Sequence, residues 1–414
     1  MRIEPSTRFR PGRAGMKILH VLHTSLPYIA GYCVRSDQIM RNTARLGAEC
    51  VALTSAQHPN TTAEMEVLED VRHYRTQKTG VPRTPVLRER ALMRLLEERL
   101  ETVLKAERPD VIHAHSPVLV GNPALRSARK ARIPLVYEVR DLWENALVDR
   151  GRFGASSFLY QGARTFETRL LNRADHVVTI SEQLKAEIRS RQRHPNVSVV
   201  GNGVDLVDLT EDLVGAAPAQ LPFDNDWPTL GYIGTFQPYE GLRTLIDAYV
   251  RLRRQGRQLN LAIVGGGGEE GELRKYAEQI DVAPAVFMPG KVAKTAVPSF
   301  YKAIDYFAYP RIDSPTTRLT TPLKPLEAMV ARKVVCVSDL PAMRELVSDR
   351  STGRVFTAGD SGSLATVLTD LLDDADTTGA LTKSAFNWVA TRRDWRELAK
   401  NYLPIYEQCL EKAA

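Results

Sequence analysis

The chain has 414 residues, a length that accommodates two or three domains with hydrophobic cores. Hydrophobic residues make up 43% and charged residues 25%, which are the values of an ordinary globular protein and exclude disordered, fibrous and membrane-embedded classes. The net charge of +7 suits an anionic partner, whether nucleic acid, a membrane surface or a phosphorylated small molecule.

The cysteines and the first residues indicate where the protein works. Cys33, Cys50, Cys336 and Cys409 are too few and too scattered for a disulfide framework or a metal site, which favours a reducing compartment. Residues 1–15 carry four arginines but no apolar segment of a secretory signal, so we expect an unstructured leader. No run of about 18 apolar residues occurs, and we expect a cytoplasmic protein.

The first half alternates short apolar runs with longer amphipathic segments. This alternation is typical of parallel strands joined by helices. A helix is expected over 89–105, and another after Ser181, whose hydroxyl can cap the next amides. We predict an N-terminal Rossmann-like domain over 16–204 with strands at 18–22, 50–54, 111–113, 135–138 and 177–180.

The second half repeats the pattern. Residues 205–228 lack periodicity and are predicted to form a linker, and a C-terminal Rossmann-like domain follows over 229–385. Residues 386–414 are expected to form a helix that packs back on the body. The predicted fold class is therefore α/β, with two parallel sheets facing a central cleft where a small molecule binds. The strands expected in the second domain are 229–233, 260–264, 286–288, 306–309 and 334–337.

The glycine run at 265–271 contains the spacing of a dinucleotide-binding loop. Glu269 and Glu270 would place two negative charges where such a loop binds pyrophosphate, so we reject a nicotinamide site. Two readings stay open: a loop that borders a ligand, or a simple turn from strand to helix.

A basic segment at 309–329 follows a predicted strand and opens a helix near Pro325. Arg311, Arg318 and Lys324 make it a candidate diphosphate site, and Glu327 in the first helical turn can accept ribose hydroxyls. The alternative is a solvated basic loop.

Two further patterns are open to a functional and a structural interpretation. Glu138 and Arg140 leave a strand end that should face the predicted cleft, where they either contact a bound substrate or form a structural ion pair. The helix pattern over 88–99 is amphipathic and basic, so it either lies on an anionic membrane or simply covers the sheet.

The phrase PLKPLEAM at 322–329, with 334–340 and Glu345 downstream, resembles the donor-binding region of family-4 retaining glycosyltransferases of the GT-B fold. Within that family the chain most resembles the branch associated with bacterial exopolysaccharide and exosortase gene clusters, through 25–27, 31–32, 137–140 and 239–242. Individually weak matches follow in family order at 17–19, 109–115, 174–181, 201–205, 233–235 and 240–242.

The resemblance implies a role for individual residues. It implies that Lys324 contacts the nucleotide diphosphate and Glu327 the ribose, and that His115 lies beside the donor sugar. With our electrostatic candidates, the expected catalytic set is His115, Lys324, Arg318 and Arg140. The expected donor-binding set is Gly31, Gly234, Gly265, Gly266, Lys291, Arg311, Thr321, Leu323 and Glu327.

The chain departs from the family pattern at two places. Leu319 stands where the family commonly has a first glutamate, so backbone groups of Thr320, Thr321 and Leu323 are expected to bind the sugar hydroxyls instead. Thr235, Phe236 and Glu240 replace a usual basic pair. Phosphate neutralisation should then fall on the cations of the 309–329 segment.

The resemblance thus implies a retaining, metal-independent enzyme that moves a sugar from a nucleotide diphosphate sugar to an acceptor hydroxyl, with no cofactor. The acceptor is expected to be a glycan or a lipid-linked glycan, with peripheral membrane contact on the inner face and no nucleic acid partner. Alternatives are a sugar-nucleotide epimerase or phosphorylase on the same fold, or a non-catalytic nucleotide-sugar-binding protein.

Overall fold

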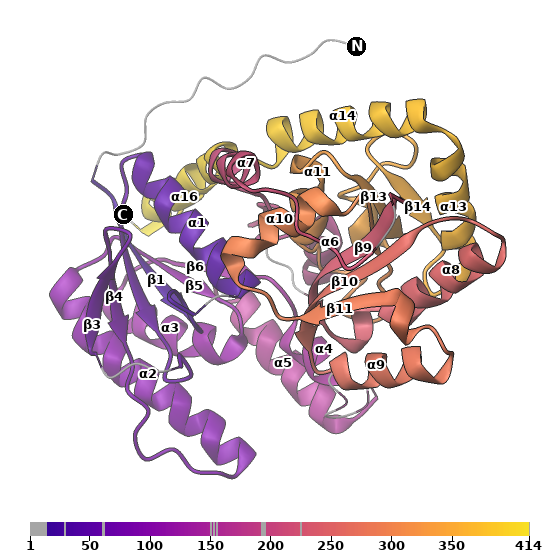
Figure 1. Cartoon of the computed structure of the whole chain (residues 1–414). Coiled ribbons are helices and arrows are strands. Elements are labelled where there is room, and N and C mark those ends of the chain that lie inside the picture. The colour runs from indigo at the N-terminus through magenta and orange to yellow at the C-terminus, as the bar shows by residue number, and fades with distance from the viewer. Residues whose placement is uncertain are drawn as a thin grey trace.

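A computed structural model describes residues 15–413, except for residues 29, 60–62, 150, 152–153, 155, 192–195 and 224–225. The expected leader at 1–15 lies, apart from Gly15, outside the described residues. The described chain forms two lobes, each a sheet flanked by helices (Figure 1). The sheet orders are β3-β4-β2-β1-β5-β6-β7-β8 and β11-β10-β9-β12-β13-β14, and every pairing is parallel except β3 with β4. The predicted α/β class with two Rossmann-like domains is confirmed.

The first lobe contains three strands that the sequence did not predict, namely β3, β4 and β8. Polar and charged residues interrupt β3 and β4, and β8 has only 3 residues, so none forms an apolar run. The strands are β1 (Lys17–Leu22), β2 (Glu49–Thr54), β3 (Met65–Leu68), β4 (Val71–Arg75), β5 (Val111–His115), β6 (Leu135–Val139), β7 (His176–Thr179) and β8 (Val197–Val199). The helices are α1 (Gly31–Arg45), α2 (Pro85–Glu107), α3 (Val118–Ala131), α4 (Trp143–Asp149), α5 (Phe158–Leu171) and α6 (Glu182–Arg191).

The second lobe begins inside the interval predicted as a linker. The interval 205–228 contains α7 (Leu206–Gly215), which Asp205 caps and whose Leu213 joins the second core, so the linker prediction was wrong for this part. The strands are β9 (Thr229–Phe236), β10 (Asn260–Gly267), β11 (Val286–Gly290), β12 (Tyr306–Tyr309), β13 (Val334–Ser338) and β14 (Arg354–Phe356). The helices are η1 (Pro238–Glu240), α8 (Leu242–Arg254), α9 (Glu270–Gln279), η2 (Ala283–Ala285), η3 (Lys294–Ala296), α10 (Val297–Ala303), α11 (Lys324–Val330), α12 (Pro341–Arg344) and α13 (Ser361–Asp373).

The C-terminal segment returns from the second lobe to the first. It is not the single helix predicted over 386–414 but consists of α14 (Ala375–Arg392), α15 (Trp395–Leu398), η4 (Ala399–Asn401) and α16 (Tyr402–Ala413). The break falls at Asp394, which bridges to Val204 and caps α15. Beyond it, Tyr402 and Tyr406 pack in the core of the first lobe, and α16 lies beside that lobe in Figure 1.

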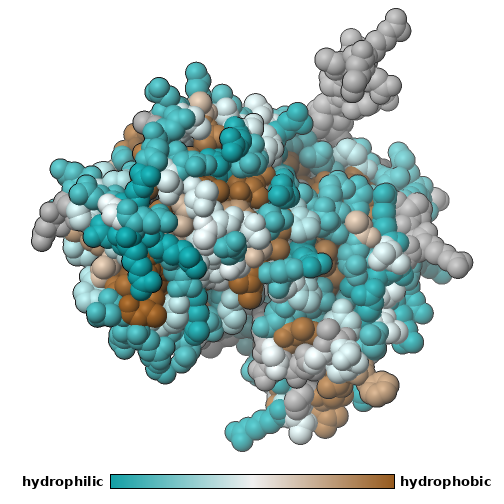
Figure 2. Space-filling view, turned by 90° about the vertical axis from the view of Figure 1, so that its right-hand side faces the viewer, coloured by the Kyte–Doolittle hydropathy of each residue, from teal (hydrophilic) through white to brown (hydrophobic). Residues whose placement is uncertain are grey.

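Most strands are buried and mainly aliphatic, so each sheet packs against helices on its faces. The predicted site residues lie at or after the carboxyl ends of the strands. On the face shown in Figure 2, hydrophilic residues predominate and hydrophobic residues form small separate areas. Within the described residues, no helix has both the length and the apolar composition needed to cross a bilayer.

Candidate active site

Lys324 and Glu327 form the centre of the predicted donor site, one turn apart at the start of α11. The Nζ atom of Lys324 lies 2.9 Å from Oε2 of Glu327, and the buried hydroxyl of Tyr301 donates to the same oxygen over 2.8 Å. The hydroxyl of Tyr309 donates to the carbonyl of Lys324. Burial raises the pKa of both tyrosines, so both remain hydrogen-bond donors. The Lys324 side chain is 36% exposed. Its ammonium group and the Glu327 carboxylate, which these contacts hold in place, are therefore both accessible to solvent.

The carboxyl ends of β9 and β10 bring three predicted glycines together. Gly234 pairs with Gly265, whose φ of +135° and closeness to the Gly234 carbonyl leave no room for a side chain. A Cβ on Gly266 would lie 2.9 Å from Cγ of Lys291, so these two residues are neighbours. The packing at the ends of these strands therefore explains why positions 234 and 265 are glycine. Gly266 and Lys291 lie together at the outer margin of this edge of the sheet.

Gly31 begins α1 in the first lobe and faces the second lobe. A Cβ built on it would lie 3.7 Å from Cδ1 of Leu323, the residue that precedes α11. Two predicted donor-binding residues that are 292 positions apart in sequence are thus adjacent in space. The start of α11, with Lys324 next in the chain, lies at the contact between the lobes.

Arg311 is not the exposed phosphate ligand that was predicted. Its guanidinium is buried and donates to both carboxylate oxygens of Glu240, at 2.7 and 3.1 Å, and to the carbonyl of Thr320 at 3.1 Å. Burial by itself would lower the pKa of Arg311, but the Glu240 carboxylate raises it overall. The charge is therefore neutralised within the protein, and the pair ties η1 to the loop before α11.

Arg318 is likewise paired within the protein. It is bonded to the Asp313 carboxylate, five residues earlier in the same loop, and its side chain is 61% exposed. The Arg318 charge is thus paired within its own loop, and its catalytic role stays a prediction.

Thr321 contacts the first lobe rather than an open site. Its carbonyl accepts the side-chain amide of Asn202 at 2.6 Å, and its buried hydroxyl donates to the carbonyl of Ile180. Leu319, at the position of the expected glutamate, accepts the Ser181 hydroxyl through its carbonyl. The carbonyl of Thr320 is bonded to Arg311. The carbonyl groups of Leu319, Thr320 and Thr321 are thus engaged within the protein, and the expectation that backbone groups of Thr320, Thr321 and Leu323 bind the sugar hydroxyls stays a prediction.

Glu345 joins the lobes at the start of α6. Its two carboxylate oxygens each accept one backbone amide, from Glu182 and Gln183, at 3.0 Å. The Ser181 hydroxyl caps the same helix by accepting the Leu184 amide, as predicted. In the sequence, Glu345 stood out only as part of the family motif. Its partner Glu182 is 163 residues away, so no local pattern predicted this contact.

His115 is fully buried at the end of β5, so the expectation that it contacts a donor sugar was wrong for this conformation. The Arg140 guanidinium, which can only donate, lies 2.6 Å from Nδ1 of His115. The remaining ring nitrogen, Nε2, therefore carries the hydrogen and donates to His20 Nδ1 at 3.1 Å. Burial and then the Arg140 charge lower the pKa of His115 to about 3, so the ring stays neutral.

Arg140 belongs to a buried ion network, in agreement with the structural alternative for this residue. Its Nε donates to Oε1 of Glu138 at 2.8 Å, and Arg35 of α1 donates to the same oxygen at 3.1 Å. Arg35 also donates to the hydroxyl of Tyr402 in α16. The network joins α1, β6 and α16, and the sequence did not single out Arg35 or Tyr402.

Three buried histidines, His20, His113 and His115, have ring nitrogens within 4.8 Å of one another. Such a group has the composition of a metal site. Arg35 and Arg140 flank it, however, and Glu138 is the carboxylate that pairs with both. A divalent cation would add charge to a buried cluster that already carries a net positive charge, so the donor set does not suit a metal.

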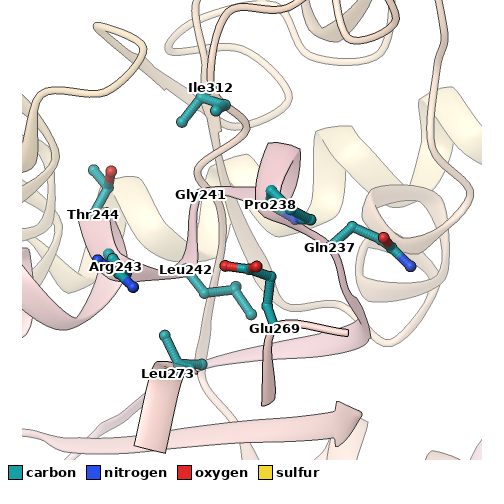
Figure 3. Close-up of a pocket in the computed structure, with 9 residues that line it drawn as sticks. All are labelled: Gln237, Pro238, Gly241, Leu242, Arg243, Thr244, Glu269, Leu273 and Ile312. Atoms are coloured by element: carbon teal, nitrogen blue, oxygen red, sulfur yellow. The ribbon is translucent and has the colours of Figure 1, made fainter. Parts of the chain in front are cut away.

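A pocket of about 250 Å³ lies beside η1 in the second lobe. Figure 3 shows Ile312 at one end, Leu273 at the other and the Glu269 side chain between them. Gly241, with φ of +67°, passes so close to the carbonyl of Pro310 that a side chain would not fit. None of the predicted donor-binding residues lines this pocket, so it neighbours the loop fixed by Arg311 and Glu240 but is distinct from the Lys324 and Glu327 pair.

Comparison with known proteins agrees with this architecture. Residues 215–388 match the family model of glycosyl transferases group 1, and residues 30–203 match that of the glycosyl transferase 4-like domain. The chain is similar to glycogen synthase of Mycobacterium tuberculosis, with 26% identity over 306 residues that cover 72% of this chain and 69% of that protein. It is also 26% identical over 209 residues to a phosphatidyl-myo-inositol mannosyltransferase of Mycolicibacterium smegmatis, covering 50% of this chain and 51% of that protein.

Solved structures show the same fold. Sucrose-phosphate synthase from Thermosynechococcus elongatus has a TM-score of 0.78 at 19% identity and covers 96% of this chain and 100% of its own. HepE from Anabaena in complex with UDP has a TM-score of 0.71 at 21% identity, covering 95% and 100%. Two Rossmann-like lobes in this arrangement are the GT-B fold of glycosyltransferases. The second lobe matches the group 1 glycosyltransferase family, and the first lobe matches the glycosyl transferase 4-like domain.

Proposed function

We propose that this protein transfers a sugar from a nucleotide diphosphate sugar to an acceptor hydroxyl, with retention at the anomeric carbon and without a metal or cofactor. The observation that carries the proposal is the Lys324 and Glu327 pair, held by Tyr301. Lys324 offers its charge to the diphosphate, and Glu327 offers a carboxylate to the ribose hydroxyls. Gly31, opposite Leu323, lets the backbone of the first lobe approach the same point.

The proposed reaction breaks the bond between the anomeric carbon and the β-phosphate oxygen and forms a bond from the acceptor oxygen to the same face of the sugar. The acceptor proton passes to the departing phosphate oxygen. Negative charge grows on the leaving diphosphate, and a cation that is already in place stabilises it without reorganisation. Lys324 has that role. His115 and Arg140 are buried and paired with each other, so neither is assigned to the reaction.

We further propose that the reaction belongs to bacterial glycan or exopolysaccharide synthesis at the cytoplasmic face, with a glycan or lipid-linked acceptor and peripheral membrane contact. The similarity to a mannosyltransferase that is named for a phosphatidylinositol supports a lipid-borne acceptor. The fold shared with a protein solved with UDP supports a nucleotide-linked donor. The exopolysaccharide branch rests on the resemblance of residues 137–140 and 239–242.

A screen of UDP-, GDP-, ADP- and TDP-sugars by thermal shift tests the donor assignment. The matching donor should raise the melting temperature in a concentration-dependent way, because a ligand that binds only the folded state stabilises it. The matching donor, labelled in the sugar, should then be hydrolysed slowly by the protein alone and transferred when a glycan or lipid acceptor is added. The absence of any stabilising donor would overturn the proposal.

The same incubation separates the competing functions. An epimerase would convert the sugar of the intact donor with no acceptor present, and a phosphorylase would require inorganic phosphate. A non-catalytic binding protein would be stabilised by the donor but would leave it intact. Each of these outcomes would replace the transferase assignment.

A further inference from the structure

Two helices of the first lobe begin with large hydrophobic side chains in solvent. In α2, Val86 is 64% exposed and Leu87 is 54% exposed. In α5, Phe158 is 96% exposed and Leu159 is 67% exposed. Leaving such side chains in water does not stabilise the folded state. Two adjacent exposed hydrophobic side chains at each helix start therefore indicate a surface that a partner covers.

The two hydrophobic ends lie at the same end of the molecule. The helix α2 follows β4 and the helix α5 follows β6 and α4, so both leave the carboxyl edge of one parallel sheet. The helix α3 packs between them, since it contacts both α2 and α5. Figure 1 shows α2 and α5 both beginning at the lower end of the molecule, and hydrophobic surface also gathers at the lower end in Figure 2.

Basic residues predominate where α2 begins. Residues 78–94, which lead into α2 and form its first turns, contain five basic residues and one acidic residue. Arg83, Arg90 and Arg94 are exposed. Arginines beside exposed Val and Leu side chains match a surface in which phosphate groups overlie hydrocarbon.

We propose that this end of the first lobe, defined by Val86, Leu87, Phe158 and Leu159 with the basic residues at 78–94, docks on an anionic lipid bilayer. The two hydrophobic tips are separated by α3 and do not form one continuous patch, which fits insertion at two points into lipid better than the single core of a protein interface. The inference rests on the proposed function in one respect: it makes the acceptor hydroxyl that of a membrane lipid. The docking itself requires no catalysis.

Vesicle co-sedimentation of the full chain tests the docking. Wild type should bind vesicles of phosphatidylcholine with 30% phosphatidylglycerol and bind pure phosphatidylcholine vesicles at least about 5-fold less, because the arginines need anionic headgroups. Binding should fall in 0.5 M NaCl. The double variant Phe158→Ser/Leu159→Ser should lower the bound fraction about 5-fold or more. Val214→Ser is the matched control, because Val214 is 77% exposed on α7 in the second lobe.

The outcomes separate docking from the proposed function. Failure of wild type to bind anionic vesicles, equal binding to neutral vesicles, or equal binding by the double variant would each overturn the docking proposal. Thermal stabilisation of the double variant by the nucleotide sugar should equal that of wild type, which shows that the variant is folded and keeps its donor site. If no nucleotide sugar stabilises wild type but vesicle binding follows the expected pattern, the proposed function fails and the docking proposal stands.

Discussion

The guanidinium of Arg311 lies against the carboxylate of Glu240, with both oxygens bonded and both side chains buried. The resemblance to the family implies a basic residue at the position of Glu240, so the loop after β9 carries a negative charge where a positive one was expected. Arg311 compensates for that reversal inside the protein. Arg311 is thus buried in its pair, whereas Lys324 is 36% exposed beside Glu327.

Removing one member of the Arg311 and Glu240 pair should destabilise the fold strongly. Arg311→Gln should cost about 3–5 kcal/mol, because it leaves a buried carboxylate unpaired. Urea unfolding measures the change. The double variant Arg311→Gln/Glu240→Gln should lose less than the sum of the single variants. Arg257→Gln, which breaks the exposed pair with Asp373, should cost far less, because solvent screens that pair. Equal losses for the two arginine variants would contradict the buried pairing.

Lys324→Ala should lower turnover of the matching nucleotide sugar by about 10²-fold or more, the effect of losing one strong electrostatic contact in the transition state. Lys383→Ala, an exposed lysine on α14, is the control and should keep full activity. Steady-state kinetics with the donor identified by thermal shift provides the measurement. Near-normal turnover of the Lys324 variant would remove the diphosphate assignment.

Glu345→Ala should loosen the contact between the lobes, because the amides of Glu182 and Gln183 lose their acceptors. Small-angle X-ray scattering should show a larger radius of gyration for this variant. Asp360→Ala is a matched control, since it removes a carboxylate cap within one lobe, on α13, at a similar cost of about 1 kcal/mol. An unchanged radius in both variants would show that other contacts hold the lobes together.

Glu167 should make stability depend on pH in an unusual direction. Burial, with the nearby Glu144 charge, raises the pKa of Glu167 to about 8, and Tyr137 donates to its Oε1. The folded state therefore holds a proton that the unfolded chain releases near its ordinary pKa of 4.5, so this contribution to stability is complete below pH 4.5 and is lost as the pH rises toward 8.

The variant Glu167→Gln is neutral at every pH and should gain stability over wild type as the pH rises from 5 to 8, by on the order of 2–4 kcal/mol. Urea unfolding at three pH values measures the difference. The exposed Glu411→Gln should follow the wild-type profile. Parallel profiles for wild type and Glu167→Gln would contradict the neutral form of Glu167.

Activity should persist in excess EDTA, because the proposed leaving-group stabilisation uses Lys324 rather than a metal. The transfer assay with and without the chelator measures it. If EDTA abolished activity and Mg²⁺ or Mn²⁺ alone restored it, the metal-independent proposal would fail. Zn²⁺ should not raise the melting temperature either, since Arg35 and Arg140 disfavour a cation at the three histidines.

The parts of the fold that can be predicted from the sequence are those determined by residues that are close together in the chain. Apolar runs such as those of β10 and β13 identify buried strands, and Ser181 marks a helix start. The strands β4 and β14 escape this reasoning because each contains a buried arginine, Arg75 or Arg354, whose charge is paired with a carboxylate outside its own strand. The break at Asp394 also depends on a distant partner, Val204.

The candidate site divides in the same way. Lys324 and Glu327 are three positions apart on one helix, so their proximity follows from the helical repeat. The partner of Arg311 is 71 residues away, and no spacing rule connects them. His115 illustrates a different limit, because a strand end can place a side chain in the interior as well as at a surface. Only its contacts with Arg140 and His20 decide between the two.

The packing of α16 against the first sheet has a consequence for biosynthesis. Ile18 of β1 shares a core with Tyr402 and Tyr406, which are translated after all the strands of the second lobe. The second lobe can therefore fold as a unit while the first still lacks part of its interior. The core of the first lobe is therefore complete only after the second lobe has been synthesised.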